Sequence, residues 1–262
     1  MSVAALVLYN EARKGMVITW GYRANLVTEL LTLFFVFIFV SYFIGGGELE
    51  SEQLPTALLG YLIWFYAAIA ISSMSGNLTG EASTGTLEQL YMSPMPSWLV
   101  FVGRVISTFL TSTVMVAILA LTLILVMRIS FPFTLEALPP FVLTMVGLFG
   151  FGYAIGGLTL VYKQIGSVNS LVTNMLLFMN GALLPVHFFP AWLETFARLL
   201  PTTQGIIVMR KVIIDGESLA AVWADGSMVY LAVQSTIFLL AGWVIFNIGE
   251  RFAKRRGTLG QY

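Results

Sequence analysis

The stretch LVTELLTLFFVFIFVSYFI at residues 26–44 carries one charged side chain, Glu29, in an otherwise mainly apolar run. A helix needs roughly 20 mainly apolar residues to cross about 30 Å of hydrocarbon, because each residue adds about 1.5 Å. A second stretch, LPTALLGYLIWFYAAIAISSMSG at residues 54–76, has no charged residue at all. Both stretches therefore predict membrane-spanning helices.

Segments of this kind recur along the whole chain. Six of them predict spans at about 26–44, 54–76, 99–127, 141–161, 168–186 and 229–248. The composition agrees, because 58% of the 262 residues are hydrophobic and only 10% are charged. We therefore expect a single domain, an all-α membrane protein with six transmembrane helices. The first apolar run is too long for the core of a cleaved signal peptide, so we expect it to be retained as the first span.

Several classes of chemistry are excluded by what the sequence lacks. It has no cysteine, and His187 is its one histidine, so neither a thiolate site nor a histidine set can hold a metal. No Gly-x-x-x-x-Gly-Lys-Ser/Thr sequence occurs, so we expect no nucleotide and no cofactor to be bound by this chain. Neither a His-Glu-x-x-His nor a Gly-x-Ser-x-Gly sequence occurs, which argues against an enzyme. Equal numbers of acidic and basic residues, 13 each, give no reason to expect nucleic acid binding.

The positions of the cations predict the orientation of the chain. Six spans put both termini on one side, and cations concentrate on the cytoplasmic side of membrane proteins. With both termini in the cytoplasm, nine cations lie inside: Arg13, Lys14, Arg23, Arg104, Lys163, Arg251, Lys254, Arg255 and Arg256. The remaining four, Arg128, Arg198, Arg210 and Lys211, then lie outside. We expect both termini to be cytoplasmic.

Two segments outside the spans also predict helices. In residues 1–25, one helical stripe is largely apolar and Arg13 and Lys14 fall opposite it, which is typical of a helix lying at the membrane interface. A plain charged flank that only sets topology is the alternative interpretation. Between the fifth and sixth spans, residues 189–215 predict short external helices, since Pro190 suits a helix start and an apolar face follows it.

The loop between the second and third spans is the most informative part of the sequence. Thr86 and Gln89 have the spacing of a capping box, which predicts the start of a helix. Pro94 and Pro96 then end it, so we expect a helix at about 84–94. Its apolar residues Leu87, Leu90 and Tyr91 share one face, which could enter a groove of a partner protein. A polar loop with a single helical turn is the alternative interpretation.

This loop resembles the loop signature of ABC-2-type permeases. The resemblance is carried by Glu81, by the run Gly85-Thr86-Leu87-Glu88, by Leu90, by Ser93-Pro94 and by Gly103-Arg104. A second landmark of that family resembles the stretch from Leu200-Pro201 to Arg210. Span number, loop lengths and order extend the resemblance over nearly the whole chain.

The resemblance implies a transport subunit of an ABC exporter in the cytoplasmic (inner) membrane of a prokaryote. In that family the loop helix is a coupling helix that docks on a cytosolic ATPase subunit, present in two copies, which binds ATP and Mg. A second permease copy or homologue completes the transporter, and the N-terminal helix is the connecting helix at the same interface. The implied docking residues are Arg13, Lys14, Glu81, Gly85, Thr86, Leu87, Glu88, Gln89, Leu90 and Tyr91. The family exports drugs, lipids, glycans and peptides.

Polar residues within the predicted spans are candidates for a substrate path. They are Glu29 in the first span and Asn169, Thr173, Asn174 and Asn180 in the fifth. Hydrogen bonding between helices explains the second group equally well, and Glu29 could instead extend to the membrane interface or pair with Arg23. Other functions that the sequence allows are an ion-coupled carrier or a structural membrane subunit without an ATPase partner.

Overall fold

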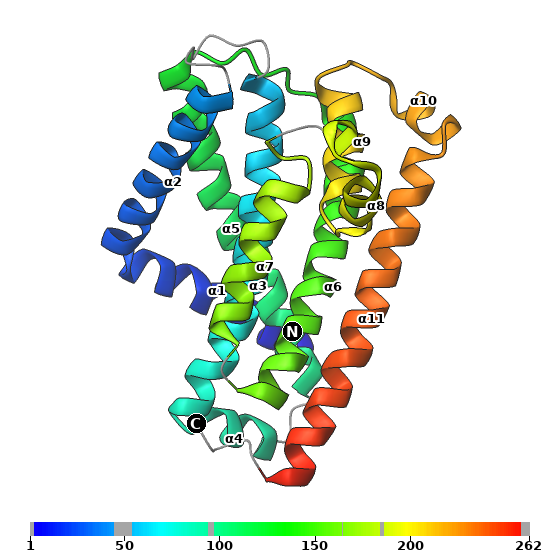
Figure 1. The fold of residues 1–262 in the computed structure, drawn as a ribbon. Helices are drawn as coiled ribbons and strands as arrows, with labels where there is room; N and C mark the ends of the chain where they lie inside the picture. The colour runs from blue at the N-terminus through cyan, green and yellow to red at the C-terminus, as the bar shows by residue number, and fades with distance from the viewer. Residues whose placement is uncertain (1–2, 45–53, 94–96, 164, 184–185, 258–262) are drawn as a thin grey trace.

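The structure is a computed structural model that describes residues 3–44, 54–93, 97–163, 165–183 and 186–257. Every regular element in these residues is helical, which confirms the predicted fold class for this part of the chain (Figure 1). The long helices are α1 Val3–Gly21, α2 Arg23–Ile44, α3 Leu54–Ser83, α5 Ser97–Met127, α6 Leu138–Tyr162, α7 Gly166–Met179 and α11 Ser227–Arg256. The short ones are α4 Thr86–Met92, α8 Ala191–Leu199, α9 Thr203–Ile213 and α10 Leu219–Ala224, with 3-10 turns at Leu135–Ala137 and Val186–Phe188.

Five helices of the described chain are long and apolar enough to cross a membrane: α2, α3, α5, α6 with the turn before it, and α11. The protein is therefore a multi-pass membrane protein. The predicted fifth span at 168–186 does not form one helix of that length. Its helical part, α7, has 14 residues, or about 21 Å, which is less than the hydrocarbon thickness. The number of spans thus stays a prediction.

The early end of α7 has a local cause. Asn180 follows the helix, and its side-chain Oδ1 accepts a hydrogen bond from the backbone N–H of Ala182 at 2.8 Å. Gly181 between them has a φ of 81°, which glycine adopts without strain. This turn stops the helix after Met179, and the hydropathy of the residues beyond it gave no sign of the stop.

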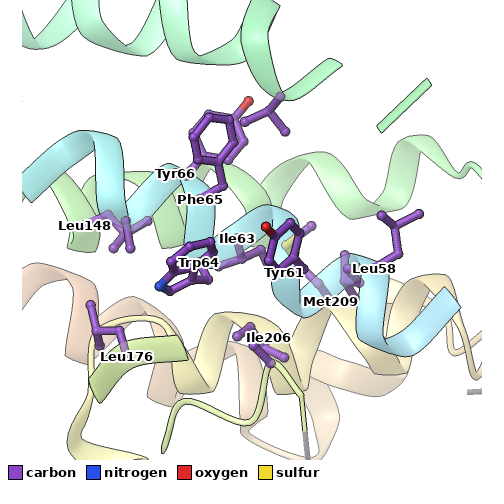
Figure 2. Packing of buried hydrophobic residues seen from close by; sticks show 14 of the residues in the cluster. Leu58, Tyr61, Ile63, Trp64, Phe65, Tyr66, Leu148, Leu176, Ile206 and Met209 are labelled. Atoms are coloured by element: carbon purple, nitrogen blue, oxygen red, sulfur yellow. The ribbon is translucent and has the colours of Figure 1, made fainter. Parts of the chain in front are cut away.

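The core is organised around α3, whose side chains are buried over most of its length. Figure 2 shows Trp64 and Tyr61 of α3 among side chains from three other helices: Leu148 of α6, Leu176 of α7, and Ile206 and Met209 of α9. The indole N–H of Trp64 donates to the carbonyl oxygen of Thr173 at 2.8 Å, which fixes α7 against α3. Helix α3 therefore forms the centre of the bundle: α2, α5, α6, α7 and α9 pack on it, while α11 packs on α6 and α1 on α5.

Helices α6 and α11 approach each other closely through glycines. A Cβ atom built on Gly242 of α11 would lie 1.9 Å from the carbonyl oxygen of Gly150, and one on Gly249 would lie 2.3 Å from that of Gly157. Small residues allow such backbone contact between membrane helices. The other side of α6 meets α3, where a Cβ on Gly152 would lie 2.8 Å from the carbonyl oxygen of Ala70.

The two ends of the bundle carry different short helices (Figure 1). Helix α4 lies at the same end as the last turns of α11, and α8, α9 and α10 lie at the opposite end. Helix α1 runs across the bundle and packs on α5, where a Cβ on Gly15 would lie 2.0 Å from Oγ of Ser107. The end that carries α4 therefore also gathers the contacts of α1, α3, α5 and α11.

Candidate functional site

Helix α4 begins differently from the capping box that the sequence predicted. Its N-cap is Gly85, in the left-handed conformation with a φ of 73°, and no side chain caps the helix. Thr86 is already the first helical residue, and its hydroxyl donates to the carbonyl oxygen of Glu81 at 3.2 Å. The capping-box prediction was wrong, because a glycine turn reverses the chain one residue earlier. The left-handed conformation of that turn favours glycine.

The apolar face of α4 packs on its own chain. Leu87 is fully buried, and Leu90 and Tyr91 are partly buried in the same cluster. Their neighbours include Leu78 of α3, Phe101 of α5, and Phe246 and Ala253 of α11. The predicted apolar surface for a partner is therefore an anchor that fixes α4 to three helices of the bundle.

The opposite face of α4 is open to solvent. Thr86, Glu88 and Gln89 are exposed, and Met92 is 76% exposed. Glu88 lies in the first turn, where the positive end of the helix dipole stabilises a carboxylate. These four side chains form what we call the open face of α4: Thr86, Glu88, Gln89 and Met92.

Glu81 is not on a loop, because α3 continues through residues 77–83 beyond the span that was predicted to end at 76. Its carboxylate forms two hydrogen bonds with Arg104 of α5: Nη1 donates to Oε2 at 2.8 Å, and Nη2 donates to Oε1 at 2.6 Å. Oε2 of Glu11, from α1, lies 3.9 Å from Nε of the same guanidinium. Arg104 is buried. One cation therefore joins α1, α3 and α5 behind α4.

A second polar cluster lies near the same side of α4, around Tyr91. The carboxylate Oε1 of Glu250, on α11, accepts from Ser97 Oγ at 3.0 Å and from Lys254 Nζ at 2.8 Å. Lys254 Nζ also lies 4.3 Å from the centre of the Tyr91 ring. Burial, with a contribution from the nearby Glu250 carboxylate, raises the pKa of Tyr91, so its phenol stays protonated at neutral pH. These contacts tie α4 and the start of α5 to α11.

The N-terminal helix contributes two further predicted residues. Arg13 and Lys14 are exposed, on the part of α1 that crosses α5. A cavity of about 200 Å³ lies between α1, α3 and α5, and its walls include Lys14, Glu11, Glu81 and Arg104. Lys14 thus lies near the ion pairs behind α4, and the part of both cations in docking stays a prediction.

The candidate substrate-path residues do not form one cluster. Asn180 is buried in the turn after α7, where it has a structural role. Asn169 and Thr173 are half-buried and Asn174 is exposed. Glu29 is exposed on α2, a separate helix. Glu29 and Asn174 are the most accessible of the five to a passage outside this chain's own core, and the substrate path stays a prediction.

Arg210, part of the second family landmark, holds the other end of the bundle together. Its Nη2 donates to the carbonyl oxygen of Gly181 at 2.7 Å, to that of Ala182 at 3.2 Å and to that of Thr56 at 3.3 Å. Burial lowers the pKa of Arg210 to about 10, an effect that the carboxylate of Asp215 opposes. The guanidinium is still protonated at pH 7, and it fixes α9 to α3 and to the turn after α7.

Sequence reasoning missed the partners in these clusters. Glu11 and Glu250 were not predicted as site residues, and Arg104 was used only as a cytoplasmic cation and as part of the family motif. A signal was present for one pair, because Glu81 lies in the predicted loop and Arg104 near the start of the span that follows it, and their opposite charges favour pairing. No spacing rule linked either of them to Glu11, since α1 is distant in sequence.

Comparisons with known proteins agree with the motifs. The family profile of the ABC-2 type transporter matches residues 11–214. Two curated proteins, each named "Probable multidrug ABC transporter permease YbhR", come from Escherichia coli strain K12 and from Escherichia coli O157:H7. Each is 28% identical over 166 residues, which is 62% of this chain and 44% of the relative, so the match spans less than half of each relative. Because the family profile covers most of the chain, this protein belongs to the ABC-2 type transporter family as a permease.

Proposed function

We propose that this chain is the membrane subunit of an ATP-driven exporter and that the open face of α4 binds the ATPase subunit. The observation that carries the proposal is the construction of α4. A seven-residue helix is too short to be stable by itself, yet it is fixed by Leu87 inside and presents Glu88, Gln89 and Met92 outside. Such an element can transmit a displacement from a bound partner into the bundle.

The ion pairs behind α4 define where that displacement goes. Arg104 connects α3, which leads into α4, with α5 and α1. Glu250 connects α5 with α11. A bidentate arginine-carboxylate pair has a specific geometry, so the two helices that it joins tend to move together. Motion of α4 would therefore reach four helices directly.

Orientation and partners follow from the same assignment. If the ATPase is cytosolic, the end with α4, α1 and the end of α11 faces the cytoplasm, in agreement with the distribution of cations. This is the arrangement proposed for a prokaryotic inner membrane, with both termini inside. ATP and Mg are bound by the ATPase subunit, and export is outward. A drug is the first substrate class to test, because the E. coli relatives are named as probable multidrug permeases.

A second permease copy is proposed to pack against α2. Most of this helix lies outside the core of the single chain, and Phe35, Phe39 and Phe43 are each about two-thirds exposed. Exposed Glu29 on the same helix and Asn174 on α7 would then line the passage between two copies. This arrangement gives both polar residues an environment other than lipid.

The docking proposal is tested by co-purification with candidate nucleotide-binding subunits. The double variant Glu88→Lys with Met92→Asp changes the open face without touching the buried anchor, so it should release the ATPase. Its two unfavourable interactions with the helix dipole should lower the stability of the chain by no more than about 2 kcal/mol. The control variant Glu217→Lys with Trp223→Asp makes the same kinds of change at the opposite end, where Trp223 is 51% exposed. Retention of the ATPase by the α4 variant, or its release by the control, would contradict the proposal.

A further inference from the structure

A large apolar pocket lies in the half of the bundle away from α4. Its volume is about 600 Å³, within the range of pockets that hold small organic ligands. The floor is made by buried residues of α3, among them Leu58 and Ile63, and the mouth by exposed residues such as Leu121, Phe133 and Leu138. The pocket therefore runs from the surface of the bundle to its core.

The pocket exists because α5 and α6 both pack on α3 and contact each other little. The ring of Phe109 on α5 closes the gap at one end, where its centre lies 6.2 Å from that of Phe141 and 6.0 Å from that of Phe149. The chain between α5 and α6, including Phe131 and Phe133, borders it at the other end. The opening lies between two candidate membrane spans, so it faces the lipid phase.

The lining indicates the chemistry of the occupant. None of its described residues is charged, and its polar side chains are Tyr66, Thr113 and Thr134. Two of these already have partners: Thr113 Oγ1 donates to the carbonyl oxygen of Phe109 at 2.7 Å, and Thr134 Oγ1 accepts from the N–H of Glu136 at 3.3 Å. A hydrocarbon is the ligand that such walls favour.

The length of the pocket fits one membrane leaflet. Its lining on α5 extends from Thr113 to Ile124, which is about 16 Å along the helix axis, and one leaflet contributes about 15 Å of hydrocarbon. A single acyl chain that enters from the side can therefore lie along α5.

A cation lies where the headgroup of such a lipid would be. Arg128 follows α5 directly, one helical turn beyond Ile124, and its side chain is exposed. Within the described part of the chain no carboxylate forms an ion pair with it. Arg128 also has a φ of 52° and is followed by a hydrogen bond from the N–H of Ile129 to the carbonyl oxygen of Ile124, a helix end at which glycine is the usual residue. An arginine is thus present at a position where the backbone favours glycine.

We infer that the pocket between α5 and α6 binds one acyl chain of a glycerophospholipid from the surrounding leaflet, with the lipid phosphate at Arg128. With the orientation proposed above, this is an outer-leaflet lipid. The inference concerns a site within one chain, so it does not require the ATPase, the second copy or transport.

The test uses the full chain in vesicles that contain phosphatidylglycerol with a photoreactive group near the end of one acyl chain. After irradiation, labelled peptides are identified by mass spectrometry. We expect labelling of residues 113–141 to exceed that of the exposed face of α11. Ala120→Trp, which fills the pocket, should lower the labelling about tenfold, and Val233→Trp on α11 is the matched control.

Arg128 is tested separately. Arg128→Gly removes the cation and suits the left-handed backbone, so it should lower the labelling about threefold without lowering the Tm, and Arg128→Lys should retain most of it. Equal labelling in wild type and Ala120→Trp would overturn the site. A photoreactive hydrocarbon that has no headgroup serves as a second probe. If it labels the pocket as strongly as the lipid probe does, and Arg128→Gly has no effect, the assignment to a phospholipid is overturned. All these outcomes are independent of ATPase docking.

Discussion

Arg104 shows how single residues stabilise the end of the bundle that carries α4. It is buried, its charge is balanced by the carboxylate of Glu81, and the carboxylate of Glu11 lies 3.9 Å from its Nε. Removing one partner leaves a buried charge uncompensated, so Glu81→Gln should cost about 3 kcal/mol, or roughly 6–12 °C in Tm. Thermal unfolding of the purified chain in detergent measures this. The double variant Glu81→Leu with Arg104→Met should recover much of the loss, and a loss as large as that of Glu81→Gln would contradict the pairing.

Gly85 is the second residue with a specific structural role. Its positive φ turns α3 into α4, so Gly85→Ala should destabilise the chain by about 1 kcal/mol. Gly80 is the matched control, because it lies inside α3 with no atom near its missing Cβ. Gly80→Ala should raise stability by about 0.5–1 kcal/mol. If the two variants shift the Tm in the same direction, the role assigned to the turn is incorrect.

At the scale of helices, the pair α6 and α11 depends on close backbone approach. Gly242→Ala would bring a Cβ to 1.9 Å from the carbonyl oxygen of Gly150, so the helices must separate. We expect a loss of about 1–3 kcal/mol, as for other overpacked sites. Gly76→Ala, where nothing lies within 4 Å, is the control and should not destabilise. Thermal unfolding compares the two variants, and equal changes in Tm would show that the glycine contact does not contribute to stability.

Among the helices, some features could be predicted from the sequence and others could not. The long apolar helices α2, α3, α5, α6 and α11 follow from hydropathy, since a span needs only length and apolar composition. The direction of the apolar face of α4 does not follow, because Leu87 can pack on a partner or on its own chain with the same sequence pattern. The end of α7 at Asn180 and the contact of Glu11 with Arg104 are tertiary features that no local pattern encodes.

At the scale of the whole molecule, the exposed aromatic side of α2 predicts an assembly of two permeases. The chain has no cysteine, so a single introduced cysteine reports contacts without background. Phe39→Cys should form a disulfide between two copies in membranes under mild oxidation, because the position is 64% exposed on α2, the helix proposed to contact the second copy. Val233→Cys, 53% exposed on α11, should remain monomeric. Dimers through α11 alone would contradict the proposed interface.

The proposal that the ATPase docks at the α4 end of the molecule is tested most directly by one crosslinking measurement. Met92 on the open face of α4 and Trp223 on α10 are each exposed, and the helices α4 and α10 lie at opposite ends of the bundle (Figure 1), so each residue is replaced by cysteine in turn. With a thiol-reactive crosslinker and the co-purified ATPase subunit, we expect a covalent product of chain and ATPase from Met92→Cys and none from Trp223→Cys. A product from Trp223→Cys, or none from Met92→Cys in an intact complex, would contradict it.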